Sequence, residues 1–146
     1  MVLANNMTEV LFYITEETKV RHSLTWRIAR AAVMQQRHVY IHTASQEEAV
    51  YLDKLFWQQP VEGFLPHALL SDDPNAINPV VIGHGPEPGP CHDVLINLAP
   101  QTPSFFSRFL RVAELITGDE EVRISGRERW RFYQHQGYPL TSHKIS

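Results

Sequence analysis

Short apolar runs alternate with helical patterns along this chain, and that alternation constrains the fold most. Glu9–Ile14 and Val39–His42 are rich in strand formers and too short for helices. Between them, from Leu24 to Gln36, apolar residues recur at helical spacing without an internal Pro or Gly. Strands that alternate with helices predict parallel strands joined by right-handed crossovers.

A second helix is predicted directly after the run Val39–His42. Ser45 and Glu48 form a capping box, in which each side chain satisfies a free amide of the first turn. The helix carries Ala49, Leu52 and Phe56 on one stripe and runs to about Trp57.

The middle of the chain is broken by proline. Nine of the ten prolines lie between Pro60 and Pro103, which predicts turns around two strands, at residues 79–83 and 93–98. The second run is nearly all apolar, as expected of a strand buried on both faces. Segments 68–78 and 84–92 are predicted to be loops.

Two more helices are predicted towards the C-terminus. Thr102-Pro103 is a cap followed by proline at the first helical position, and it opens an apolar helix from Phe105 to Ile116 that Gly118 closes. The second helix spans Asp119–Gly137, with Asp119 as its cap and Gly137 as its stop. The tail, residues 138–146, is too short to assign.

The helix Asp119–Gly137 has two unlike faces at 100° per residue. One side holds Val122, Gly126, Arg129 and Tyr133, and the other holds Arg123, Arg127, Trp130, Arg131 and Gln134. Guanidiniums bind carboxylates or phosphates through two hydrogen bonds, and an indole adds apolar area. The alternative is a solvated basic face with Trp130 in the core.

The net charge, the cysteine count and the length of the apolar runs exclude several classes of protein. The net charge is −3, so any basic site is local, and the broad basic surface of a duplex binder is not evident. Cys91 is the single cysteine, which leaves no intrachain disulfide. The sequence has no signal-peptide pattern and no apolar run of membrane-spanning length. We therefore expect a cytoplasmic protein.

No motif predicts catalysis, a cofactor or a metal. The glycines at 83, 85 and 89 have the wrong spacing for a dinucleotide loop, and no phosphate-loop motif is present. Cys91-His92 lacks the geometry of a nucleophile–base pair, and the eight histidines match no zinc-ligand spacing. The sequence favours a binding module. Trp57 and Phe64, in a connecting segment, fill a small satellite core or form a partner-binding patch.

A set of residues spread over nearly the whole chain has a characteristic order and spacing. It begins with Phe12-Tyr13 and includes Leu52-Asp53, Trp57, Phe64, Pro66-His67, Asp93–Leu98, Phe109, Arg111-Val112, Glu114, Arg127–Trp130, Tyr133 and Gly137-Tyr138. In these residues the chain resembles the chi subunits of bacterial DNA polymerase III. The resemblance implies a single Rossmann-like α/β domain over residues 1–146. Its mostly parallel sheet would be flanked by helices and would lack a nucleotide-binding loop.

The resemblance also implies a role as a non-catalytic accessory subunit of the clamp-loader complex. In that family, one surface binds the psi subunit, and this surface corresponds here to Trp57 and Phe64. Another surface holds the acidic C-terminal tail of single-stranded DNA-binding protein. It corresponds to Arg123, Arg127 and Trp130, with Ile116 at its apolar edge. The position of Arg123 carries Lys in some members, and that of Trp130 carries Tyr.

These implications combine into one hypothesis about the tail. Arg127 takes the terminal carboxylate, Ile116 and Trp130 form the pocket, and Arg123 with Arg131 attracts the acidic stretch. Two other functions stay open: direct binding of single-stranded nucleic acid by the basic aromatic face, and an enzyme whose site is assembled from scattered histidines.

Overall fold

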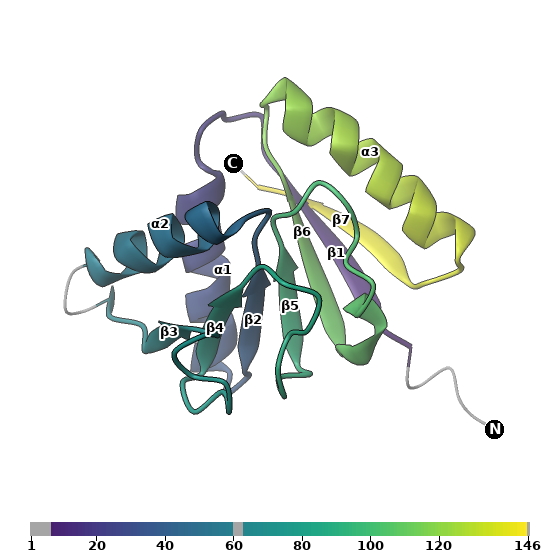
Figure 1. Ribbon diagram of the computed structural model, residues 1–146. Coiled ribbons are helices and arrows are strands. Elements are labelled where there is room, and N and C mark those ends of the chain that lie inside the picture. The colour runs from purple at the N-terminus through teal and green to yellow at the C-terminus, as the bar shows by residue number, and fades with distance from the viewer. Residues whose placement is uncertain (1–6, 60–62, 146) are drawn as a thin grey trace.

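The computed structural model describes residues 7–59 and 63–145, whose strands form one seven-stranded parallel sheet with three helices packed against it (Figure 1). The strand order is β3-β4-β2-β5-β6-β1-β7. The strands are β1 Glu9–Ile14, β2 Val39–His42, β3 His67–Leu69, β4 Val80–Gly83, β5 Val94–Asn97, β6 Arg111–Ile116 and β7 Leu140–Lys144. The helices are α1 Arg21–Met34, α2 Gln46–Trp57 and α3 Glu120–His135, with the short 3-10 helix η3 Phe106–Arg108. The predicted Rossmann-like α/β fold is confirmed.

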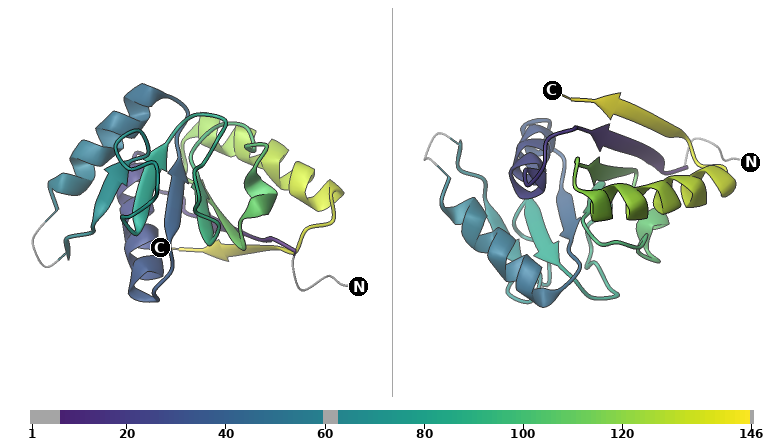
Figure 2. Two further views of the ribbon diagram at one scale, coloured as in Figure 1. Left: turned by 60° about the horizontal axis from the view of Figure 1, so that its bottom comes forward. Right: turned by 90° about the horizontal axis from the view of Figure 1, so that it is seen from above.

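The sheet separates two apolar cores. Alternate residues of each strand point to opposite faces, so that Val39 and Ile41 of β2 pack with α1 and α2, whereas Tyr40 packs on the opposite side. That opposite side carries α3, which lies over β6, β1 and β7 and is buried there through Tyr133 (Figure 2). Helices on both faces explain why the central strands are continuous apolar runs.

Several local predictions are confirmed. β1 and β2 have the predicted bounds, and α2 begins after Ser45, whose Oγ accepts a hydrogen bond from the amide of Glu48 at 3.1 Å. The carboxylate of Glu48 accepts from the amide of Ala44, one residue before the expected donor. At the end of α3, Gly137 has a φ of +80°, a backbone conformation that favours glycine.

The helix predicted from Phe105 to Ile116 is wrong. Phe106–Arg108 is one turn of 3-10 helix, and Arg111–Ile116 is strand β6, paired in parallel with both β5 and β1. A central strand buried on both faces has no polar alternation, so its apolar residues also fit a helical spacing. Gly118 closes this strand, and a Cβ there would meet the backbone oxygen of Glu16 at 2.2 Å.

The edges of the sheet were also predicted incompletely. The unassigned tail forms β7, which pairs in parallel with β1, and the predicted loop 68–78 begins inside β3. Both are edge strands, and β7 is mostly polar and exposed, so neither has an apolar pattern to reveal it. Asp119 stands at the N-cap of α3, but its carboxylate bonds to Thr117 and to the amide of Lys19 instead of an amide of the helix.

Candidate functional site

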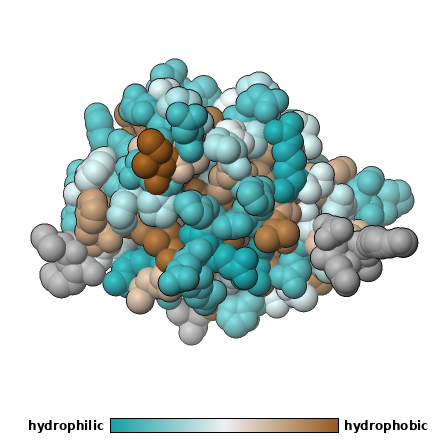
Figure 3. Space-filling view, turned by 90° about the horizontal axis from the view of Figure 1, so that it is seen from below, coloured by the Kyte–Doolittle hydropathy of each residue, from teal (hydrophilic) through white to brown (hydrophobic). Residues whose placement is uncertain are grey.

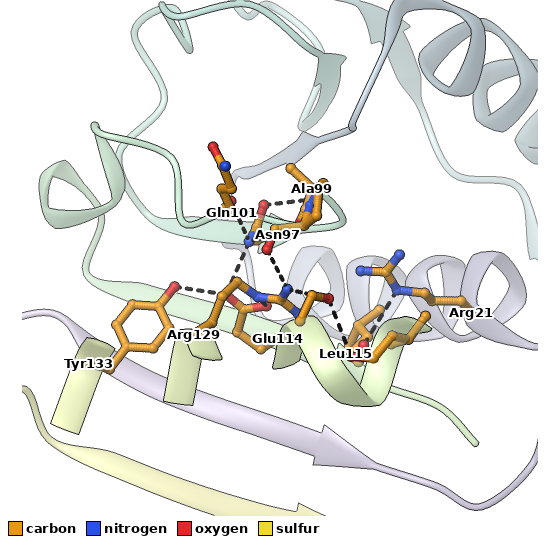
Figure 4. A network of polar contacts seen from close by, with 11 residues as sticks. Arg21, Asn97, Ala99, Gln101, Glu114, Leu115, Arg129 and Tyr133 are labelled. Atoms are coloured by element: carbon orange, nitrogen blue, oxygen red, sulfur yellow. Dashed lines mark hydrogen bonds and ion pairs between the residues drawn. The ribbon is translucent and has the colours of Figure 1, made fainter. Parts of the chain in front are cut away.

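A buried polar network joins α3 to the middle of the sheet (Figure 4). Glu114 of β6 is fully buried, and its carboxylate accepts hydrogen bonds from Arg129 Nε at 2.8 Å, Tyr133 Oη at 2.7 Å and Asn97 Nδ2 at 3.1 Å. Arg129 also donates from Nη1 to the carbonyl of Pro100 at 2.8 Å. An ion pair so buried is stable only when most of its polar atoms have partners, as these do.

The electrostatics of Tyr133 reflect this environment. Burial, followed by the neighbouring Glu114 carboxylate, raises the pKa of Tyr133 above its ordinary value. The phenol therefore keeps its proton and serves as a donor to Glu114 throughout the physiological pH range.

The network fixes the rotation of α3 about its axis. Gly126, Arg129 and Tyr133 are the residues of α3 that are buried, and helical periodicity groups them on one side together with Val122. A Cβ at Gly126 would lie 2.4 Å from the Cδ1 of Ile116, so glycine lets the helix approach β6 closely. Glycine inside a helix costs about 1 kcal/mol relative to alanine, which this close packing offsets.

With the helix fixed in this way, one flank of α3 lies on the side away from η3. We call it the basic flank, and it consists of Arg123, Arg127, Trp130 and Arg131. The three arginines follow one another at intervals of four residues, and all three are exposed. Within residues 7–59 and 63–145, none of their guanidiniums has an ion pair or hydrogen bond. Their guanidiniums are therefore available to an external anion.

Trp130 is half-buried at the base of this flank. One part of its ring packs edge-on against Phe12 of β1, with 5.0 Å between ring centroids, and the rest remains accessible. The alternative placement of Trp130 wholly in the core is thus not what the structure has. Phe132, on the other flank of α3, packs against Phe106 of η3.

A groove of about 400 Å³ lies at the start of α3, between the helix and the ends of β1, β6 and β7. Its lining is Ile14, Thr15, Glu16, Ile116, Thr117, Gly118, Arg123 and Lys144. The structure thus brings Ile116 and Arg123 together, whereas Arg127, Trp130 and Arg131 lie further along the same flank. Ile116 itself is buried, with 9% of its surface exposed, so it contributes a floor to this groove.

Sequence reasoning missed Ile14 and Lys144 of the groove because they belong to other elements. Lys144 lies in β7, and its ammonium pairs with Glu16 at 3.4 Å on an exposed surface. It also missed the network of Glu114 and Arg129. A signal for the network existed: Glu114 is the one carboxylate in the apolar run 112–116, and a buried carboxylate requires a partner.

The second predicted surface, the aromatic patch, consists of Trp57 and Phe64. Both side chains are about half exposed, at 55% and 48%, and their ring centroids lie 5.6 Å apart. Trp57 also packs on the ring of the buried His67, with 4.3 Å between the ring centroids. His67 is held by the carbonyls of Leu65 and Asp53, at 2.6 and 3.2 Å from its two nitrogens. The patch is therefore a supported, exposed aromatic pair rather than a satellite core.

Among the residues that the structure describes, no three His, Cys, Asp or Glu side chains gather closely enough to hold a metal. In the same part of the chain, no helix has the length and apolar character needed to cross a membrane.

Comparison with known proteins places this geometry in a family. The family model described as DNA polymerase III chi subunit, HolC, matches residues 7–141. A relative from Pseudomonas aeruginosa, named DNA polymerase III subunit chi, is 38% identical over 95% of this chain and 98% of its own length. Relatives of the same name from Haemophilus influenzae and Escherichia coli are 26% and 27% identical, over 92% and 73% of this chain and 95% and 73% of their own.

Proposed function

We propose, from the premise that this chain belongs to the DNA polymerase III chi subunit family, that it bridges the psi subunit and the acidic C-terminal tail of single-stranded DNA-binding protein. Family membership makes it an accessory subunit of the replicative polymerase complex. The bridging role, the absence of catalysis by the chain itself and a cytoplasmic location are parts of the proposal.

The observation that carries the tail-binding half is the basic flank. An acidic peptide that ends in an aromatic residue with a free carboxylate needs a guanidinium for that carboxylate, an apolar pocket for the ring and further positive charge. Arg127 lies between Arg123 and Arg131 and next to Trp130 on the helix. We assign it to the terminal carboxylate, because guanidiniums bind carboxylates through two hydrogen bonds. Ile116 and Trp130 supply apolar surface, and Arg123 with Arg131 attracts the acidic stretch.

An oligonucleotide experiment tests the proposed function as a whole. The protein is mixed with bare single-stranded oligonucleotide and, separately, with oligonucleotide coated by single-stranded DNA-binding protein. The proposal predicts a mobility shift with the coated oligonucleotide only, and loss of that shift when the tail is removed from the coating protein. A shift with bare oligonucleotide at similar concentrations would instead support direct nucleic-acid binding.

The aromatic patch carries the psi-binding half. Large, half-exposed aromatic side chains that are held in place by their neighbours are typical anchors of protein interfaces. Trp57 meets this description, because His67 and Phe64 support its ring while more than half of its surface stays exposed.

Trp57→Ala is expected to weaken psi binding by about 2 kcal/mol, roughly 30-fold, and to leave tail binding unchanged. Co-purification with psi and a titration with tail peptide measure the two effects. Tyr51→Ala is the matched control, since Tyr51 is an aromatic residue of the same helix with 56% of its surface exposed. The Tyr51→Ala protein should bind psi normally. If Trp57→Ala instead unfolds the protein, Trp57 has a structural role and the patch assignment is wrong.

A further inference from the structure

A second groove lies on the opposite face of the sheet from α3. Its volume is about 290 Å³, and it runs between α1 and the edge formed by β1 and β7. Parallel sheets normally have both faces covered by helices. On this face α1 contacts β2, β5 and β6, and Tyr13 of β1 is left partly exposed.

The floor of this groove is aliphatic. Leu24, Ile28 and Ala32 of α1 line one side, and Val94 and Ala113 of the sheet line the other. A space of this size, at the small end for ligand pockets, accommodates one large apolar side chain.

The rim of the groove is basic. Its lining includes Arg27, Arg37, Arg111 and His143, and among the described residues no carboxylate lines it. Arg111 pairs with Glu9 at 3.3 Å, which neutralises part of its charge. Arg27 and Arg37 are exposed, and within the described part of the chain neither guanidinium has a hydrogen bond or ion pair.

Charge complementarity selects the occupant. We propose that this groove, here called the α1 groove, is a second binding site for an acidic peptide that carries one large apolar side chain. Arg27 and Arg37 would pair with its carboxylates, and the aliphatic floor would take the apolar side chain.

Single-stranded nucleic acid fits the α1 groove less well. Its bases bind by stacking on aromatic faces, and the floor here is aliphatic, with Tyr13 as the one aromatic ring of the lining that is not a histidine. The chain also carries a net charge of −3. The surface at the N-terminal ends of the strands is mostly hydrophilic, with apolar residues in separate spots, so a broad apolar partner is not favoured there either (Figure 3).

The α1 groove is expected to bind more weakly than the basic flank, because it offers two free guanidiniums where the flank offers three. Two sites on opposite faces would let one molecule hold two acidic tails at once, and the two tails are linked where they belong to one complex. Linkage of that kind raises the overall affinity without new contacts.

The test is an NMR titration of the full chain with a synthetic peptide of five aspartates followed by a C-terminal phenylalanine. The unaltered protein should show two sets of shifting signals, one near Trp130 and a weaker one near Tyr13 and His143. Combined Arg27→Ala and Arg37→Ala should abolish the second set and leave the first. Arg127→Ala should weaken the first set and leave the second.

The outcomes separate this inference from the proposed function. If Tyr13 and His143 do not respond while Trp130 does, the α1 groove is not a peptide site and the proposed function stands. If only Tyr13 and His143 respond, the basic flank is wrong and the α1 groove stands. If an oligothymidylate shifts the signals of Tyr13 and His143 and the peptide does not, the occupant has been assigned wrongly and the inference is overturned.

Discussion

Arg129→Ala is expected to lower the free energy of unfolding by about 3–5 kcal/mol. The change removes the guanidinium that donates to Glu114 at 2.8 Å and leaves that carboxylate buried, with Tyr133 and Asn97 as its remaining hydrogen-bond donors. An uncompensated buried charge is costly, and a loss of this size is a large part of the total stability of an ordinary domain, about 5–15 kcal/mol.

Urea denaturation followed by circular dichroism measures the loss. Arg131→Ala is the matched control, because Arg131 is exposed on the same helix and its replacement should change stability by about 0.5 kcal/mol or less. A loss below 1 kcal/mol for Arg129→Ala would mean that the network does not hold α3 on the sheet.

Arg127→Ala is expected to weaken binding of the acidic tail at least tenfold without changing stability or psi binding. A peptide of this size is expected to bind near micromolar, about −8 kcal/mol. Removing one partner of a hydrogen-bonded charge pair costs about 2–5 kcal/mol, which exceeds the 1.4 kcal/mol of a tenfold change. Calorimetry with tail peptide measures the affinity.

Arg108→Ala provides the control for position on the molecule. Arg108 is an exposed arginine of η3, on the other flank of α3, and it pairs with Glu87 at 3.2 Å. Its replacement should leave tail affinity unchanged. Equal affinity of Arg127→Ala and the unaltered protein would remove Arg127 from the site.

Binding of the tail by the unaltered protein should also weaken with added salt, since the guanidiniums of the basic flank are exposed.

The fold was predictable where local pattern and tertiary environment agree. Glu9–Ile14 and Val39–His42 are short and mostly apolar, and a helix follows each of them; their bounds were predicted correctly. The pattern was ambiguous for Arg111–Ile116, because burial on both faces removes the alternation that separates strand from helix. The apolar pattern gave no signal for Leu140–Lys144, which is a strand because it pairs with β1.

The candidate site was likewise predictable only in part, where a local pattern along one helix was sufficient. Helical periodicity alone separated Arg123, Arg127 and Arg131 from Arg129, and in the structure the first three are exposed and Arg129 is buried. It could not supply Lys144 or Ile14, because their proximity to Arg123 depends on how the strands meet the start of α3. It also could not identify the partner of Glu114, which lies fifteen residues away on another element.

The central physical claim is that the buried pair of Glu114 and Arg129 sets the rotation of α3 and thereby exposes the basic flank, to which we assign the acidic partner as a proposal. The chain has three tryptophans, Trp26, Trp57 and Trp130, so its indole N–H signals report separately on different surfaces. An NMR titration with the acidic tail peptide, near its tighter dissociation constant, should shift the Trp130 indole signal and leave those of Trp57 and Trp26 in place. A shift of the Trp57 signal with Trp130 unmoved would contradict the account.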